Sequence, residues 1–162
     1  MQEFIFFHNP EETYGFLSNW YLSDFVIDGI KYTSVEQYMM YQKASLFEDE
    51  DSKKEIMSTE NVGKIKYIGR SIRCFDDHIW NGMRQIVVYN ALVAKFSQNE
   101  ILKKQLIDTK NAILAECAVQ DKIWGIGLSI KDNQKYDRKR WEGKNLLGYS
   151  LMCVRKEMKM IY

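Results

Sequence analysis

The stretch Thr33–Phe47, with the sequence TSVEQYMMYQKASLF, is the segment around which the fold is predicted to be built. Most of its residues are good helix formers, and Thr33 or Ser34 supplies a side-chain oxygen that can cap the first turn. Glu36 and Lys43 are seven residues apart, so a helix places a carboxylate and an amine on one face, about 10 Å apart along its axis. This pattern is typical of a solvated surface helix, and it also suits a face that grips a small molecule from two sides.

Composition indicates one folded domain. The chain has 162 residues, of which 46% are hydrophobic, and it has a single proline and no Ser/Gly-rich linker, so we predict one domain over residues 1–162. The formal net charge of +1 neither favours nor excludes a nucleic-acid partner, because a local basic patch can exist within a neutral total.

Cysteine usage indicates a reducing compartment. Cys74, Cys117 and Cys153 are odd in number and widely spaced, which fits buried thiols better than a disulfide framework. With only two histidines and no Cys-x-x-Cys spacing, no metal site and no cofactor are expected. The N-terminus lacks the basic start and cleavage site of a signal peptide, and no apolar run approaches the roughly 20 residues of a membrane span. We therefore expect a soluble, cytoplasmic protein.

Short apolar runs predict a small amount of β structure near the N-terminus. Phe4–Phe7 is expected to be a buried strand, since it ends at Asn9-Pro10. Asp28-Gly29 lies between two further apolar runs and predicts a hairpin with a two-residue type I′ turn. That hairpin leads directly into the Thr33–Phe47 helix.

The remaining periodic segments predict helices. Asp76–Phe96 is apolar around so much of its circumference that we expect it at the centre of the core, with Trp80 and Met83 as packing residues. The segment Asn99–Ile107 is amphipathic, and Ile101 is among the residues expected to face inward. By contrast, the acidic run Glu48–Asp51 is expected to be solvated surface at the start of a short helix.

Several segments carry residues suited to a binding site. The Tyr14–Trp20 loop combines aromatic rings with Ser and Asn, as a flat ligand ring requires, although an ordinary packed loop has the same content. Glu116 interrupts an apolar run, where burying an ionised carboxylate costs several kcal/mol unless it has a partner. The segment 131–144 is a surface loop with six basic and three acidic residues that could steer a polyanion, or be a solvated insertion. The helix start at 143–148 offers backbone N–H groups to a phosphate, without the Walker pattern.

The order of the motifs resembles the NADAR family, the YbiA-like proteins, over about residues 4–155. The motifs that carry the resemblance are Tyr14-Gly15-x-x-Ser18-Asn19, Ser34-Val35-Glu36-Gln37-Tyr38 with Gln42-Lys43, Gly69-Arg70, Trp80, Lys95-Phe96, Leu114-x-Glu116, Asp121-x-x-Trp124-Gly125-x-Gly127 and Asn145-x-x-Gly148-x-x-Leu151-Met152-x-x-Arg155. Two departures stand out: Gln37 is at a position where many members have His, and the basic stretch 132–140 has the character of an insertion.

The resemblance implies an α+β fold that is mainly α, a compact helical domain with a small N-terminal β element. It also implies N-glycosidase chemistry on ribosides, with Lys43 as a nucleophile that forms a Schiff base with ribose C1 and Glu36 as a nearby acid or base. Asp121 is a further catalytic candidate. The residues expected to bind substrate are Tyr14, Gly15, Ser18, Asn19, Arg70, Trp80, Glu116, Trp124, Gly125, Gly127, Asn145 and Gly148.

The chemistry of these residue types agrees with that expectation. A carboxylate stabilises the positive charge that develops at C1 when a ribose C–N bond breaks. A lysine is nucleophilic only when unprotonated, so its pKa must fall through burial or a cationic neighbour. We expect the loops at Tyr14 and Trp124 to provide that burial.

Three functions remain open, two enzymatic and one non-catalytic. ADP-ribose attached to guanine, free or in nucleic acid, is preferred, because Arg70 and the 143–148 helix start suit a diphosphate and the basic loop suits a polynucleotide. The alternatives are phosphoribosylamino-pyrimidine intermediates of riboflavin synthesis, and a non-catalytic module that binds ADP-ribose or NAD.

Overall fold

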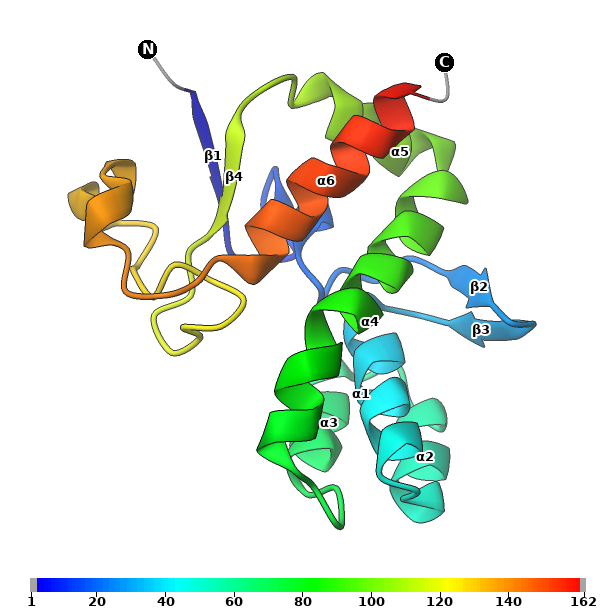
Figure 1. Ribbon diagram of the computed structural model, residues 1–162. Coiled ribbons are helices and arrows are strands. Elements are labelled where there is room, and N and C mark those ends of the chain that lie inside the picture. Colours follow the sequence, from blue (N-terminus) through cyan, green and yellow to red (C-terminus); the bar gives the residue numbers. More distant parts are fainter. Residues whose placement is uncertain (1–2, 161–162) are drawn as a thin grey trace. The chain divides into compact units, whose positions relative to one another are not determined.

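The computed structural model describes residues 3–160, which contain six α-helices and two small two-stranded sheets (Figure 1). The prediction of a mainly α, α+β fold is therefore confirmed. The described residues form two compact units. Unit 1 consists of residues 3–21 and 99–160, and unit 2 consists of residues 22–98.

Unit 2 begins with the hairpin that the Asp-Gly pair predicted. Strands β2 (Phe25–Ile27) and β3 (Ile30–Tyr32) are antiparallel, and the two turn residues have φ angles of 51° at Asp28 and 76° at Gly29. A type I′ turn needs positive φ at both central positions, which Asp and Gly tolerate best. The prediction of this hairpin is confirmed.

Helix α1 (Val35–Leu46) follows at once and is the centre of unit 2. The Ser34 side chain accepts a hydrogen bond from the backbone N–H of Gln37, so the predicted cap is confirmed. The helix packs against α2 (Glu50–Met57), α3 (Val62–Arg70) and α4 (Asp77–Ser97). All but five of its residues are buried, which a helix enclosed on three sides requires.

Gln37 ties the start of α1 to the end of α2. Its carboxamide oxygen accepts from the backbone N–H of Thr33 at 2.8 Å and from that residue's hydroxyl at 3.1 Å. Its amide nitrogen donates to the carbonyls of Ile56 at 3.2 Å and Thr59 at 3.0 Å. A carboxamide offers both an acceptor and two donors, so this buried side chain satisfies four contacts that no imidazole could satisfy together.

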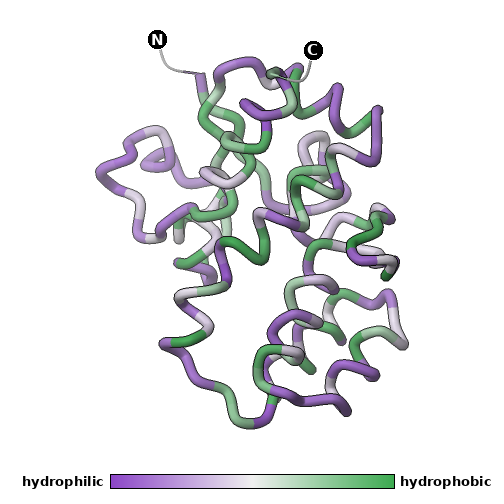
Figure 2. The backbone as a smooth tube through the Cα atoms, turned by 45° about the vertical axis from the view of Figure 1, so that its right-hand side comes forward, coloured by the Kyte–Doolittle hydropathy of each residue, from purple (hydrophilic) through white to green (hydrophobic). Residues whose placement is uncertain are grey.

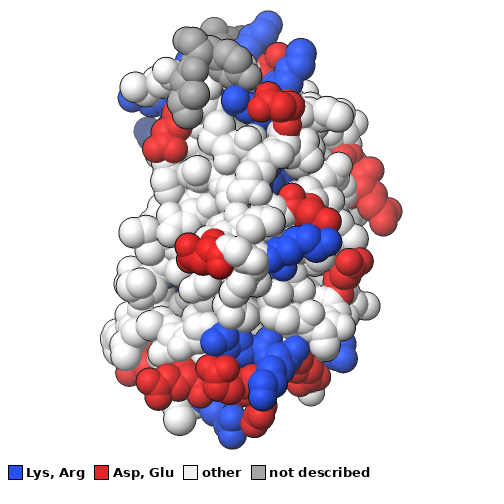
Figure 3. All heavy atoms as spheres, turned by 90° about the vertical axis from the view of Figure 1, so that its right-hand side faces the viewer, with Lys and Arg blue, Asp and Glu red and all other residues white. Residues whose placement is uncertain are grey.

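The prediction that the acidic run after α1 is solvated surface is wrong at Asp49. This residue is 2% exposed and its carboxylate caps α2 by accepting from the backbone N–H of Ser52. It also accepts from the backbone N–H of Arg73 at 2.9 Å and from the guanidinium of the same residue at 3.0 Å. Its neighbours Glu48, Glu50 and Asp51 are exposed as expected. On the face shown in Figure 3, charges of both signs are intermixed at the lower end, where α2 lies in Figure 1.

Helix α4 is less buried than its apolar composition predicted. Trp80 is 7% exposed and packs as expected, but Ile79, Met83 and Ile86 are 51%, 41% and 57% exposed. These three positions follow one another at helical spacing, so they form an apolar stripe on the solvent side of α4. The expectation that Met83 packs in the core is therefore wrong.

Unit 1 combines two strands distant in sequence with two helices. Strand β1 (Phe4–Phe7), predicted with these bounds, pairs in parallel with β4 (Ile113–Glu116). Helix α6 (Leu146–Met160) packs against β4 and against α5 (Glu100–Asp108). The hydropathy along the backbone alternates within the helices, as their amphipathic packing requires (Figure 2).

The inward face predicted for the segment Asn99–Ile107, which forms α5, is only partly right. Leu102 and Leu106 of α5 are buried, whereas Ile101 is 74% exposed, so the prediction that it faces inward is wrong. In the last helix Leu147, Leu151, Val154 and Met158 recur at helical spacing and are all buried. Short 3₁₀ helices occur at Gly15–Leu17, Asn133–Tyr136 and Arg138–Arg140. No helix among residues 3–160 combines the length and apolarity that a membrane crossing demands.

Candidate functional site

Lys43 lies near the end of α1, half-buried, with its amine held inside unit 2. The Nζ atom donates a hydrogen bond to the carbonyl of Gly69 at 2.6 Å, in the last turn of α3. It also lies 4.2 Å from the centre of the Phe75 ring and 5.9 Å from that of Trp80. The amine therefore has one polar contact and two aromatic neighbours.

The surroundings of Lys43 lower its pKa on balance. Burial lowers the pKa of Lys43, and the positive charge of Arg70 lowers it further, while the carboxylates of Glu36 and Asp77 act in the opposite direction. The carbonyl of Gly69, at a helix C-terminus, and the two rings also favour the ammonium form. Burial is the largest of the contributions to the pKa, so a larger fraction of this amine is neutral near pH 7 than for a lysine in water.

Glu36 is 4% exposed on the same helix as Lys43, and its charge acts on the lysine. Two turns of helix separate the two residues, as the spacing predicted. The side chain of Glu36 is thus a buried carboxylate within electrostatic range of a half-buried amine. This pairing of an acid with an amine of lowered pKa is what proton transfer and nucleophilic attack at neutral pH require.

Arg70 and Trp80 complete the set of predicted residues that unit 2 brings together. Arg70 ends α3 with an exposed side chain whose charge reaches Lys43, and Trp80 is buried on α4 beside the same amine. The charges of Glu36 and Arg70 and the ring of Trp80 therefore all act on the amine of Lys43, and these four residues come from three helices.

Two neighbours of Lys43 were not among the predicted site residues. The first is Gly69, whose carbonyl holds the amine. A Cβ at this position would overlap Sδ and Cγ of Met40, so a larger residue here would require that side chain to move. The second is Phe75, which is 42% exposed in the turn before α4. In the sequence its only signal is its position directly before an acidic pair, Asp76-Asp77.

The remaining predicted residues belong to unit 1, and the Tyr14 loop contains four of them. Gly15 is required for its turn, because a Cβ there would overlap the carbonyl of Pro10. Ser18 uses its hydroxyl to accept from the backbone N–H of Trp20 at 3.1 Å, and Tyr14 is exposed. Asn19 is 5% exposed, and within residues 3–160 its buried Oδ1 accepts no hydrogen bond. An unsatisfied buried amide oxygen is a candidate acceptor for a ligand.

The Trp124–Gly127 segment is shaped by Asp121. One carboxylate oxygen of Asp121 accepts from the backbone N–H groups of Ile123 at 3.0 Å and Trp124 at 2.8 Å, so this residue organises the turn. Gly125 and Gly127 are buried, and Gly127 has a φ of 73°, which favours glycine. These contacts show Asp121 as a turn-forming residue, and its catalytic role stays a prediction.

Asn145 proves to be a structural clamp. Its side chain is fully buried, donates to the carbonyl of Leu114 at 3.0 Å and accepts from the backbone N–H of Glu116 at 3.1 Å. It thereby hydrogen-bonds α6 to the free edge of β4. Gly148, one turn on, has no room for a Cβ, which would overlap both the Leu114 carbonyl and the Asn145 carboxamide. Binding of substrate by Asn145, Gly148 and Glu116 stays a prediction.

Comparison with known proteins identifies the family. The model of the NADAR domain matches residues 5–159. The chain is 39% identical over 163 residues to N-glycosidase R617 of Acanthamoeba polyphaga mimivirus, covering 96% of each chain. It is 30% identical over 159 residues to riboflavin biosynthesis protein VVA0006 of Vibrio vulnificus, covering 98% of this chain and 40% of that one.

A solved structure supports the same assignment. The NMR structure of YbiA from Escherichia coli, a protein named N-glycosidase YbiA, superposes with a TM-score of 0.81 at 30% identity, covering 99% of this chain and 88% of that one. The class of protein is thus the N-glycosidases of the YbiA type. The chain belongs to the NADAR domain family, and the predicted resemblance is confirmed.

Proposed function

We propose that this chain hydrolyses the bond between ribose C1 and the nitrogen of a ribosylated base, with ADP-ribosylated guanine as the preferred substrate. One observation carries the catalytic part of the proposal: the half-buried amine of Lys43 has a lowered pKa and shares a helix with the buried carboxylate of Glu36. The names of the relatives support an N-glycosidase in general.

In the proposed reaction Lys43 leaves the Gly69 carbonyl as a neutral amine and attacks C1. The C1–N bond to the base breaks, its electron pair passes to the base nitrogen, and an acid supplies the proton that this nitrogen takes up. Glu36, when protonated, is our first candidate for that acid. The new C1–Nζ bond becomes a Schiff base as the ribose ring opens at O4, and the proton that Nζ loses in this step passes to O4. Water then adds to C1 and releases the lysine.

The preference for an ADP-ribosyl substrate rests on charge. Arg70 supplies an exposed cation whose field reaches Lys43, which suits a substrate phosphate. The segment 131–144 supplies further cations and aromatic rings on unit 1. The riboflavin-pathway intermediates remain a second candidate because the Vibrio relative is named for that pathway. We place the reaction in the cytoplasm, since three widely spaced cysteines fit a reducing compartment. Cys117 is a buried thiol as expected, whereas Cys74 and Cys153 are exposed, so the expectation of burial is wrong for these two.

The test replaces the nucleophile. Lys43→Ala is expected to lower release of guanine from an ADP-ribosylated oligonucleotide by at least about 10³-fold while binding of ADP-ribose persists. Lys54→Ala, which removes an exposed lysine of α2, is the matched control and should keep full turnover. Because a neutral amine attacks and a protonated acid assists the leaving base, the wild-type rate should rise with pH as Lys43 loses its proton and fall again as that acid loses its own.

Three outcomes decide between the candidates. Borohydride added during turnover should trap a ribose adduct on the Lys43 peptide, seen by mass spectrometry, and an unmodified peptide contradicts the Schiff base. Faster release of base from a phosphoribosylamino-pyrimidine than from ADP-ribosylguanine favours the second substrate class. Binding of ADP-ribose by the wild type without turnover of either substrate favours a non-catalytic binding module.

A further inference from the structure

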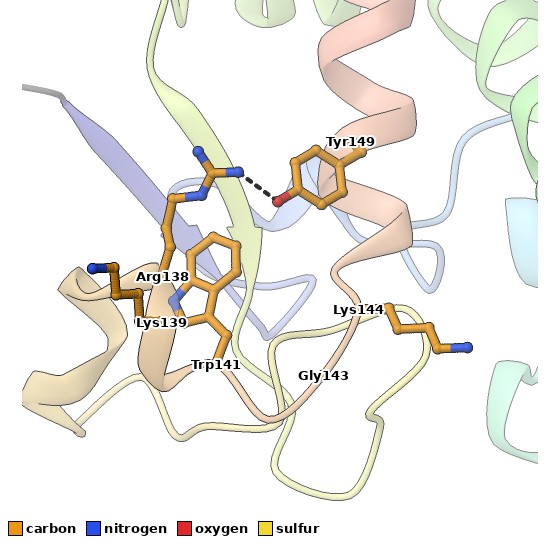
Figure 4. Close-up of a pocket in the computed structure, with 6 residues that line it drawn as sticks. All are labelled: Arg138, Lys139, Trp141, Gly143, Lys144 and Tyr149. Carbon is orange, nitrogen blue, oxygen red and sulfur yellow. Dashed lines mark hydrogen bonds between the residues drawn. The ribbon is translucent and has the colours of Figure 1, made fainter.

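A basic surface pocket on unit 1 has no part in the chemistry proposed for Lys43. Its volume is about 410 Å³, and its walls come from the end of the basic segment and the first turn of α6 (Figure 4). The lining residues are Arg138, Lys139, Trp141, Gly143, Lys144 and Tyr149. Three of the six are cations and two are aromatic.

Arg138 is the centre of this pocket. Its Nη2 donates to the Tyr149 hydroxyl at 2.8 Å, and its guanidinium carbon lies 5.8 Å from the Trp141 ring and 5.9 Å from the Tyr149 ring. Figure 4 shows the guanidinium and the phenol directed toward each other, with the indole beside them. One hydrogen bond occupies one of five guanidinium N–H donors, so the others stay available to an anion.

Two lysines extend the positive charge on either side of that centre. In Figure 4 the amines of Lys139 and Lys144 lie on opposite sides of the aromatic group and point away from it. Within residues 3–160 neither they nor Arg138 has a carboxylate within 4.0 Å, whereas the nearby Glu142 pairs with Lys122 at 2.8 Å. The result is an uncompensated row of three positive charges with rings in its middle.

The pocket wall is held in place by hydrogen bonds to the rest of unit 1. The indole N–H of Trp141 donates to the carbonyl of Lys135 at 2.8 Å. The backbone N–H of Gly143 donates to the carbonyl of Ile126 at 2.8 Å, and that of Lys144 to the carbonyl of Lys122 at the same distance. A pre-ordered wall lowers the entropic cost of binding a ligand.

We propose that this pocket binds the backbone of a single-stranded nucleic acid, with phosphates on the three cations and a sugar or base against Trp141 and Tyr149. Cations on both sides of a ring pair suit successive phosphates of a strand better than one compact anion. Rings accept a base face only when that base is unstacked, which favours a single strand over a duplex. The inference rests on the proposed function in one respect, since it makes a polynucleotide the carrier of the modified guanine.

The test measures binding of a fluorescein-labelled 12-nucleotide oligo(dT) by anisotropy. Lys139→Ala and Lys144→Ala are each expected to weaken binding several-fold, and Arg138→Ala about tenfold. For each phosphate that a variant no longer neutralises, the slope of log affinity against log salt should become shallower by about 0.7. Lys156→Ala removes one exposed charge from α6 outside the pocket and should leave affinity and slope nearly unchanged. Thermal melts establish that each variant is folded.

Four results would overturn the inference: equal weakening by Lys156→Ala, equal affinity for a duplex, efficient competition by ADP-ribose alone, or efficient competition by polyglutamate. The proposed function is tested separately, because Lys43→Ala protein should bind the oligonucleotide as the wild type does. Loss of turnover with intact binding in Lys43→Ala therefore tests the catalytic role of Lys43. Loss of binding in the pocket variants tests the binding of nucleic acid by the pocket.

Discussion

Replacing Asn145 tests whether this residue clamps β4 to α6 or binds substrate. In Asn145→Ala the carbonyl of Leu114 loses a donor and the N–H of Glu116 loses an acceptor. Each buried backbone group left without its partner costs about 1–3 kcal/mol. Asn145 also has a φ of 51°, a left-handed conformation that asparagine tolerates and that costs alanine about 1 kcal/mol more. The sum is about 3–7 kcal/mol.

A loss of that size is a large part of the 5–15 kcal/mol that typically stabilises a domain. Urea denaturation followed by circular dichroism should therefore show a much lower midpoint for Asn145→Ala, with an unchanged slope. Asn145→Gly separates the two causes, because glycine relieves the strain at positive φ but restores neither hydrogen bond. It should stay strongly destabilised, and differ from Asn145→Ala by only about 1 kcal/mol.

Asn133→Ala is the matched control, because this exposed asparagine lies in a short 3₁₀ helix of the same unit and should change stability by less than about 0.5 kcal/mol. The clamp would be refuted if Asn145→Ala cost less than about 1 kcal/mol. Should that mildly affected variant also lose affinity for ADP-ribose, Asn145 would act on the ligand, as the sequence pattern predicted.

Two further predictions concern pH. Burial lowers the pKa of Lys95 to about 7. Above that pH the unfolded chain binds one more proton than the folded chain does, so the free energy of unfolding should rise between about pH 7 and 9. The rise is at most about 1.4 kcal/mol per pH unit. Above pH 9 Cys117 opposes this rise in stability, because burial raises the pKa of its thiol to about 12. Urea titrations of Lys95→Met should lack the rise between pH 7 and 9. A pH profile equal to that of the wild type contradicts the lowered pKa of Lys95. The hydrogen bond from the backbone of Arg73 holds the pKa of the Asp49 carboxyl well below its usual range. Wild-type stability should therefore fall with pH below about 4, whereas melting temperatures of Asp49→Asn should depend less on pH in that window; parallel profiles would count against the buried ionised carboxylate.

Local patterns predicted the secondary structure closely. The Asp28-Gly29 turn, the Ser34 cap and the Phe4–Phe7 strand occur as expected, because each depends on residues within a few positions of one another. Helical periodicity located α4 and α5 but not their orientation. Ile79 and Ile101 are exposed, since the side of a helix that packs is chosen by its neighbours in space.

The candidate site was predictable in its residue types but less so in their roles. Glu36 and Lys43 share a face because both belong to α1, and the period of the helix suffices to predict that. Asp49 looked like its three acidic neighbours, and nothing local distinguishes the one carboxylate that Arg73 reaches from 24 positions away. Asn145 holds β4 by two hydrogen bonds that the sequence did not predict, and its binding of substrate stays a prediction.

The amino-acid sequence by itself determined the helix that carries Lys43, its cap and the hairpin before it, since hydrogen bonds and torsional preferences within four residues specify these elements. The tertiary structure alone decided which groups contact that lysine and which polar side chains form hydrogen bonds within the fold. The Gly69 carbonyl is 26 residues from Lys43, and the backbone groups that Asn145 binds are 29 and 31 residues away from it. Contacts at such separations exist only once the chain has packed, and burial by that packing is what lowers the pKa of Lys43.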